Sequence, residues 1–176
     1  TSTQPNTFTE EVVTEMKKHV VRPIIFPLSN PTSKSEAHPA DLMKWTKGQA
    51  LIATGSPYQP VKYEGKDYLI GQCNNVFIFP GVGLGVIASG ATRVTDQMFL
   101  EAAKVLSRYA PVIHHPYASL FPSITELRSI SEDVAVAVAK EAIREGVCPD
   151  PPQDIERTVK ENMWTPKYPR LKKMKK

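Results

Sequence analysis

Three short apolar runs stand out in the first half of the chain. They cover Pro23–Leu28 (PIIFPL), Gln49–Thr54 (QALIAT) and Val76–Phe79 (VFIF), and each is followed by a loop of polar or small residues. Near-continuous apolar runs of this length are typical of parallel strands that are covered on both faces. Between the second and third runs, VKYEGKDYLIG predicts a β-hairpin that turns at Glu64-Gly65.

Helical periodicity alternates with these predicted strands. Two capping-box patterns, Thr7-x-x-Glu10 and Ser123-x-x-Glu126, mark helix starts. The expected helices cover Thr9–His19, Pro39–Thr46, Gly83–Ala91, Thr95–Tyr109, Ser123–Glu145 and a last segment from Pro151 to about Trp164.

This alternation predicts an α/β fold, a partial Rossmann-like doubly wound parallel sheet with C-terminal helices. The 176 residues suffice for one domain with an extension. We expect one α/β domain over residues 1–146, a helical extension over 147–166 and a basic tail over 167–176.

Composition and charge narrow the class of protein. With 41% hydrophobic and 23% charged residues, the chain is expected to be soluble and globular, with no membrane span. The net charge of +4 comes from the tail KYPRLKKMKK, which holds six of the 22 basic residues and leaves 16 basic against 18 acidic in the body. A nucleic-acid-binding domain more often carries its basic face on the fold itself, so we expect no nucleic-acid partner.

The glycine-punctuated stretch FPGVGLGV resembles a dinucleotide-binding turn only in outline. Its glycines are Gly81, Gly83 and Gly85, but Val86 stands where the third glycine of G-x-G-x-x-G is required. We therefore reject it as a pyrophosphate site, and expect small residues that let one helix pack closely against a neighbour. The chain also has no nucleophile elbow, HExxH or P-loop pattern, and Cys73 and Cys148 form no metal-binding spacing.

Asparagines are the strongest polar candidates. Asn30 follows the first predicted strand, at the edge where α/β sheets bind ligands, whereas Asn74 and Asn75 precede the third. A carboxamide can donate to a carboxylate and accept from an amide. The spacing by itself leaves open whether these residues bind a ligand or stabilise turns.

Three segments together resemble the C-terminal part of malic enzymes: RPIIFPLSNPTSKSEA, GQALIATGSPYQPV and GQCNNVFIFPGVGLGVIASGATRVTDQMF. The resemblance continues through SISEDVAVAVAKEA and ENMWTPKYPR, so it covers nearly the whole chain. It implies oxidative decarboxylation of malate to pyruvate and CO2, with NAD or NADP and with Mg²⁺ or Mn²⁺. It also implies that the dinucleotide turn, the catalytic tyrosine and lysine and the metal ligands lie upstream, so that residues 1–146 are the C-terminal part of an NAD(P)-binding domain.

The resemblance also implies roles for single residues. It places Asn30, Asn74 and Asn75 at the substrate, and Asn30, Asn75, Ser29 and Thr3 at the cofactor. The family loop around Thr3 usually carries glycines, whereas this chain has TSTQ there. No catalytic residue and no metal ligand of the family maps onto this chain.

We therefore interpret the chain as a segment of a malic enzyme, cut or processed from a longer protein because it lacks an initiator Met. We expect the isolated chain to be inactive and the intact enzyme to be a homo-oligomer in the cytoplasm or the mitochondrial matrix. Its expected partners are malate, pyruvate and the N-terminal half of the enzyme. Two alternatives are a malolactic enzyme and a non-catalytic truncated relative used for binding or assembly.

Overall fold

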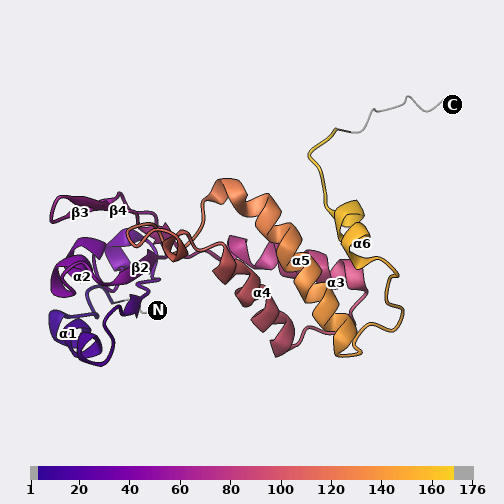
Figure 1. The fold of residues 1–176 in the computed structure, drawn as a ribbon, viewed down its shortest axis with the longest axis horizontal. Helices are drawn as coiled ribbons and strands as arrows, with labels where there is room; N and C mark the ends of the chain where they lie inside the picture. Colours follow the sequence, from indigo (N-terminus) through magenta and orange to yellow (C-terminus); the bar gives the residue numbers. More distant parts are fainter. Residues whose placement is uncertain (1–3, 169–176) are drawn as a thin grey trace.

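The computed structural model describes residues 4–168, which form two lobes (Figure 1). The N-terminal lobe runs to the end of β5 at Gln72 and has a three-stranded parallel sheet at its centre. The strand order of this sheet is β1-β2-β5, with Ile24 paired to Leu51 and Ala53 paired to Gly71. A separate antiparallel hairpin, β3-β4, turns at Glu64-Gly65 as predicted. The strands are β1 (Ile24–Ile25), β2 (Leu51–Thr54), β3 (Val61–Tyr63), β4 (Lys66–Tyr68) and β5 (Gly71–Gln72).

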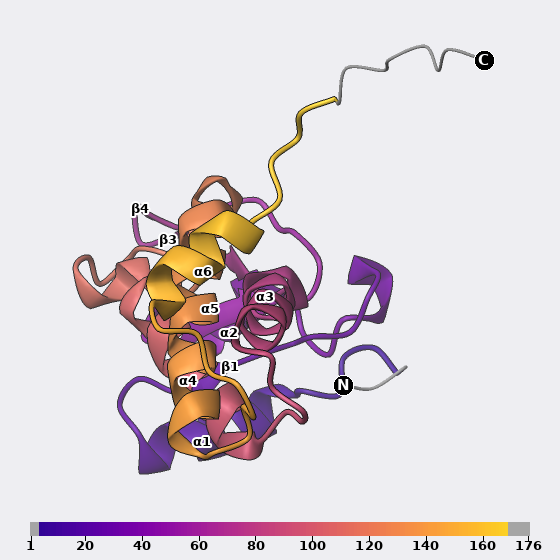
Figure 2. The ribbon, with the colours of Figure 1, turned by 90° about the vertical axis from the view of Figure 1, so that its right-hand side faces the viewer.

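The helices divide between the two lobes. Two of them pack in the N-terminal lobe and four form the C-terminal lobe (Figures 1 and 2). They are α1 (Glu10–His19), α2 (Pro39–Trp45), α3 (Phe79–Ser89), α4 (Asp96–Arg108), α5 (Leu127–Arg144) and α6 (Ile155–Asn162). Single 3-10 turns cover Thr32–Lys34, Asn75–Phe77, Pro111–Ile113 and Ile124–Glu126. The α/β class and the partial parallel sheet are thus confirmed.

The third predicted strand is wrong. Val76–Phe79 contains the end of a 3-10 turn and the start of α3, with Pro80 in the first turn of that helix. Short apolar runs do not distinguish a buried strand from a buried helical segment, which explains the error. The third strand is instead Gly71–Gln72, whose residues carry no apolar side chain.

The predicted helix starts were partly right. Ser123 and Glu126 form the predicted capping box ahead of α5. The box predicted at Thr7 and Glu10 is wrong, because Thr9 caps α1 by accepting a hydrogen bond from the backbone N–H of Val12. The last helix begins at Ile155 after the Asp154 cap, later than the two prolines suggested.

Burial in the N-terminal lobe differs between the strands of the sheet. Along β1 the exposure alternates: Ile25 is buried, whereas Ile24 on the opposite face is 55% exposed. The buried face packs against side chains of the first two helices and the hairpin, namely Val13, Leu42, Met43, Val61 and Tyr68. Along β2, by contrast, Ile52, Ala53 and Thr54 are all buried, so the expectation of strands covered on both faces holds for β2 and not for β1.

Helix α5 is the centre of the C-terminal lobe and contacts α3, α4 and α6. Its contact with α3 depends on two glycines. A Cβ on Gly81 would lie 2.6 Å from Val134 of α5, and one on Gly85 would lie 2.6 Å from the Ala135 carbonyl oxygen. These two glycines permit close helix packing, which confirms the packing interpretation. The rejection of a dinucleotide turn stays a prediction.

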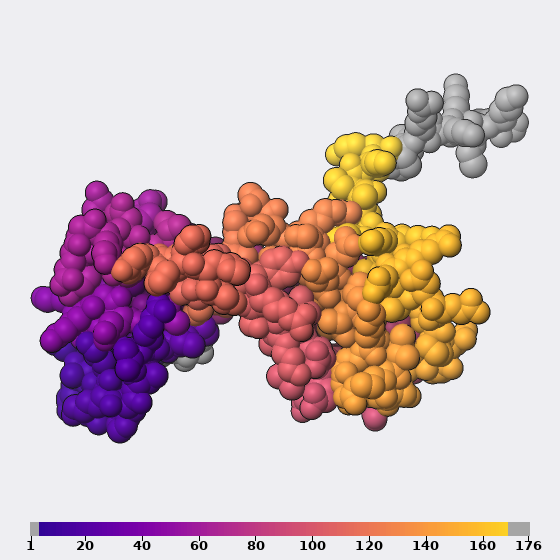
Figure 3. Space-filling view, viewed as in Figure 1, coloured from indigo at the N-terminus to yellow at the C-terminus, as the bar shows by residue number. Residues whose placement is uncertain are grey.

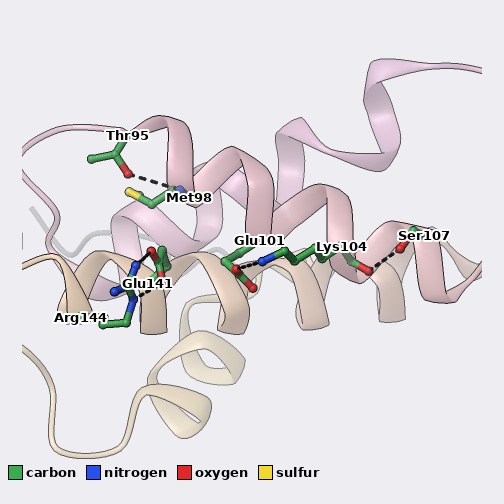
Figure 4. A network of polar contacts seen from close by, with 7 residues as sticks. All are labelled: Thr95, Met98, Glu101, Lys104, Ser107, Glu141 and Arg144. Atoms are coloured by element: carbon green, nitrogen blue, oxygen red, sulfur yellow. Dashed lines mark hydrogen bonds and ion pairs between the residues drawn. The ribbon is translucent and has the colours of Figure 1, made fainter.

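Polar contacts accompany the α4–α5 interface (Figure 4). Arg144 donates from Nε to a carboxylate oxygen of Glu141 at 2.7 Å, and its guanidinium lowers the pKa of that carboxyl. At the far end of the interface, the Tyr109 hydroxyl donates to the Asp133 carboxylate. The accompanying apolar core includes Met98, Ala102, Val105, Ile130, Val134 and Val138.

A long loop after α4 reaches back to the N-terminal lobe, and Figure 3 shows it lying across that lobe. Tyr117 receives a hydrogen bond of 2.7 Å from Lys66 Nζ, and Arg22 donates to the Pro116 carbonyl oxygen at 3.0 Å. The Phe121 ring packs against both Phe26 and Phe77. These contacts tie the two lobes together.

The predicted domain boundary at residue 146 stays a prediction. The chain passes through Gly146 to α6, which is tied to α5 by the Lys140–Glu156 ion pair of 2.6 Å. The predicted tail lies outside the described residues from 169 onward. Among residues 4–168, no helix has the length and hydropathy required to cross a bilayer.

We expect Gly85→Ala to lower the free energy of unfolding by about 1–3 kcal/mol, because the added methyl overpacks the α3–α5 contact. Gly83→Ala is the matched control on the same helix, since nothing lies within 4 Å of its Cβ position. That variant should be stabilised by about 0.5–1 kcal/mol through helix propensity. Denaturant unfolding of both variants tests this, and equal effects would contradict the packing role.

The pKa of Tyr109 is raised to about 12, first by its hydrogen bond to Asp133 and then by burial. Because an unfolded tyrosine titrates near 10, this pair stabilises the fold fully below pH ~10 and loses its effect as pH rises toward 12. A difference titration of phenolate absorbance between the wild type and Tyr109→Phe measures it. Asp133→Asn should return the pKa toward 10.

Candidate functional site

The carboxyl ends of the three parallel strands meet at one cavity of about 750 Å³. One wall is the exposed face of β1, and the opposite wall is α4 with the loop that follows it. The lining residues are Ile24, Phe26, Leu28, Asn30, Gly55, Cys73, Asn74, Asn75, Ile78, Phe79, Ala103, Leu106, Ser107, Ala110, Leu120 and Phe121. All three predicted asparagines are therefore brought to one site.

The position of the asparagine pair corrects the sequence interpretation. Because the third strand is Gly71–Gln72, Asn74 and Asn75 follow a strand and do not precede one. They thus lie at the ligand-binding edge of the sheet, as Asn30 does.

Main-chain contacts hold the strand ends close together. The backbone N–H of Gly55 donates to the Pro27 carbonyl oxygen at 3.0 Å, and that of Cys73 donates to the Thr54 carbonyl oxygen at 2.9 Å. The Gln72 side chain donates to the Gly55 carbonyl oxygen at 3.0 Å. A Cβ on Gly55 would lie 2.1 Å from the Leu28 carbonyl oxygen, so only glycine allows this approach.

The Asn30 carboxamide is oriented from two sides. Its Oδ1 accepts a hydrogen bond from the Ser56 hydroxyl, and its Nδ2 lies 3.4 Å from the Leu28 carbonyl oxygen. A carbonyl oxygen only accepts hydrogen bonds, which assigns the amide nitrogen to that side. The second Nδ2 hydrogen has no acceptor among the described residues.

The two members of the pair differ in what their side chains do. Asn74 caps the 3-10 turn, with its Oδ1 accepting from the backbone N–H of Val76 at 3.0 Å. Asn75 is exposed, and within residues 4–168 its carboxamide has no hydrogen-bond partner. The turn-stabilising interpretation thus holds for Asn74, and ligand binding by Asn75 stays a prediction.

The remaining predicted cofactor residues lie apart from the cavity lining or outside the described chain. Ser29 is half-buried, and its backbone N–H and hydroxyl donate to the Glu36 carboxylate at 3.1 and 2.7 Å. Glu36 is almost fully buried, with 1% of its surface exposed. Thr3 lies outside the described residues.

Among residues 4–168, none of those that line the cavity has a charged side chain. Its polar groups are the three carboxamides, the Ser107 hydroxyl and the Cys73 thiol, and burial raises the pKa of that thiol. Neutral N–H donors orient a carboxylate without supplying acid-base chemistry. Among residues 4–168, no three His, Cys, Asp or Glu side chains lie close enough to hold a metal ion, so the described part of the chain does not fit the divalent metal of the resemblance.

Comparison with known proteins shows the family of the chain. The family model described as "Malic enzyme, NAD binding domain" matches residues 1–143. The chain belongs to the malic enzyme family. It is 53% identical over 173 residues to the NAD-dependent malic enzyme of Aeromonas salmonicida, with 98% of this chain and 31% of that protein aligned. It is 49% identical over 170 residues to NAD-dependent malic enzyme 1 of Vibrio vulnificus, with 96% of this chain and 30% of that protein aligned.

Solved malic enzyme structures share the fold. The crystal structure of the Pyrococcus horikoshii malic enzyme has a TM-score of 0.66 and 28% identity, with 92% of this chain and 33% of that chain covered. The Entamoeba histolytica malic enzyme has the same TM-score and 25% identity, with coverage of 92% and 30%. The chain spans about a third of the length of the relatives it matches.

Sequence reasoning missed Ser56 and Gln72, whose side chains bond to Asn30 and Gly55. A signal was present for Ser56, because GSP follows the second predicted strand as SNP follows the first. Gln72 gave no signal, since its strand was not predicted.

We expect Asn74→Ala to lower the free energy of unfolding by about 0.5–2 kcal/mol, the usual cost of losing a cap. Asn75→Ala should change it by no more than about 0.5 kcal/mol, because no bond within the described chain is removed. Asn74→Asp keeps a capping oxygen and should behave nearly as wild type. Denaturant unfolding of the three variants is the measurement, and a larger loss at Asn75 would show that its side chain is structural.

Proposed function

We propose that this chain is the part of a malic enzyme that binds a carboxylate of malate and orients it beside the nicotinamide. The complete enzyme would oxidise and decarboxylate malate to pyruvate and CO2. The single observation that carries the proposal is the meeting of Asn30 and Asn75 at one uncharged cavity, each with a donor that no described group uses.

Within this proposal, Asn75 makes the principal substrate contact of the pair. Its exposed carboxamide is unengaged, whereas Asn74 is committed to its cap. Asn30 donates its second Nδ2 hydrogen to the same ligand. Because the wall is uncharged, the charge opposite the carboxylate comes from other parts of the enzyme.

The chemistry assigned to these residues is binding and orientation. Carboxamides neither gain nor lose a proton near neutral pH, so they do not act as acids or bases. They act by holding the substrate in the orientation that the reaction requires. A bound nicotinamide would supply the hydride acceptor for C2 of malate, and Asn30 and Asn75 would hold malate beside it. Ile24, Phe26 and Phe79 give the same cavity an apolar wall.

NAD is the cofactor we propose, because the Aeromonas and Vibrio relatives are named NAD-dependent. A divalent metal would be held by residues other than those described here. These relatives are bacterial, which favours a cytoplasmic location over the mitochondrial matrix. Assembly as a homo-oligomer is part of the same proposal.

The malolactic alternative differs in its product. Malate turnover that yields pyruvate with NADH identifies a malic enzyme, whereas lactate without net NADH identifies a malolactic enzyme.

The purified 176-residue chain serves as a negative control. We expect it to form no NADH from malate with Mn²⁺ or Mg²⁺, since the part described holds neither a dinucleotide turn nor a metal cluster.

In the intact enzyme we expect Asn75→Ala and Asn30→Ala each to lower kcat/KM for malate by about 10- to 150-fold. This is the value of one hydrogen bond to a charged group, about 1.5–3 kcal/mol. Asn75→Asp should be more damaging than Asn75→Ala, because it places a negative charge beside the carboxylate.

The matched control is Asn162→Ala on α6, where the carboxamide only donates to the Thr158 carbonyl oxygen. Steady-state kinetics on variants with wild-type thermal stability decide the matter. Wild-type kcat/KM at both Asn30 and Asn75 would refute the proposed binding role.

A further inference from the structure

The Asn30 carboxamide needs a fixed orientation to act as a donor. A side-chain amide presents an acceptor on one side and two donors on the other, so a half-turn about its last bond would turn the oxygen toward a bound carboxylate. Only one orientation attracts an anion. The groups that select it therefore decide whether Asn30 binds or repels.

The Leu28 carbonyl oxygen and the Ser56 hydroxyl make this selection together. The carbonyl oxygen can only accept a hydrogen bond, so it fixes the Nδ2 side of the amide, and the hydroxyl then serves the oxygen side. The hydroxyl donates to Asn30 Oδ1 from a residue 26 positions later in the chain. Ser56 is 9% exposed and is not part of the cavity lining, so it lies behind Asn30 and does not reach the ligand space.

Ser56 is itself held in place. The buried Thr54 hydroxyl donates to the Ser56 carbonyl oxygen at 2.8 Å, and Gly55 lies against the Leu28 carbonyl. The Ser29 bonds to the buried Glu36 carboxylate hold the other side of Asn30. The Ser56 hydroxyl and the Asn30 carboxamide thus lie just beyond the ends of β2 and β1, in two loops that these contacts hold together.

We propose that Ser56 is a positioning residue that holds the Asn30 carboxamide with its oxygen turned away from the cavity and one Nδ2 hydrogen available to a ligand carboxylate. This inference rests on the proposed function, because it takes malate as the ligand. It adds a residue that makes no contact with the ligand.

The test is made in the intact enzyme. We expect Ser56→Ala to raise KM for malate about 2- to 10-fold with little change in kcat, since the carboxylate is held in both the ground and transition states. Ser56→Thr keeps the hydroxyl and should have a KM for malate close to that of the wild type. The Asn30→Ala/Ser56→Ala double variant should lose no more than Asn30→Ala, because Ser56 acts only through Asn30.

Ser89→Ala is the matched control. Ser89 is also buried, with 1% of its surface exposed, and within residues 4–168 its hydroxyl bonds only to the Val86 carbonyl oxygen of α3, at 3.2 Å. It should leave KM unchanged. Wild-type KM in Ser56→Ala, or losses that add in the double variant, would overturn the inference while leaving the Asn30 result intact.

A second readout separates this inference from the proposed function. In the enzyme isotopically labelled at asparagine, Ser56→Ala should shift the Asn30 side-chain amide resonances and leave those of Asn75 in place. Unchanged Asn30 resonances would overturn the positioning role. If Asn30→Ala leaves the malate kinetics unchanged while Ser56→Ala still shifts the Asn30 resonances, the proposed ligand is wrong and the positioning role of Ser56 stands.

Discussion

The contact between Gly55 and the Leu28 carbonyl brings the ends of β1 and β2 together, and the site depends on it. A Cβ at Gly55 would lie 2.1 Å from that oxygen, a distance no side chain tolerates. With glycine there, the Gly55 N–H bonds to Pro27 and the Ser56 hydroxyl reaches Asn30. A larger residue would separate the two loops and remove the hydrogen bonds that orient the carboxamide.

A second close approach, between α3 and α5, anchors the other side of the cavity. Gly81 and Gly85 let α3 lie against Val134 and the Ala135 carbonyl, and α3 begins just after Asn75. The loop after α4 then returns to the sheet, where Phe121 packs on Phe26. The cavity is thus bounded by elements from both lobes, and in each lobe glycines allow those elements to pack closely.

Local chemistry was predictable where a residue type has a dominant local role. Ser123 and Glu126 cap α5, Gly65 turns the hairpin, and Gly81 and Gly85 of FPGVGLGV let one helix pack closely on another. The errors arose where two elements compete for the same pattern. VFIF has the composition of a strand, but Asn74 and Pro80 favour helical turns at its two ends, and the real third strand contributes only the backbone of Gly71–Gln72.

The sequence by itself determined the malic enzyme family, the α/β class and the choice of Asn30, Asn74 and Asn75 as candidates. Only the tertiary structure decided that these residues meet at one edge, that Asn74 is a cap while Asn75 is unengaged, and that Ser56 contacts Asn30. The physical reason is that strand pairing and side-chain hydrogen bonds join residues far apart in the chain. Ser56 is 26 positions from Asn30, and no periodicity encodes a contact of that kind.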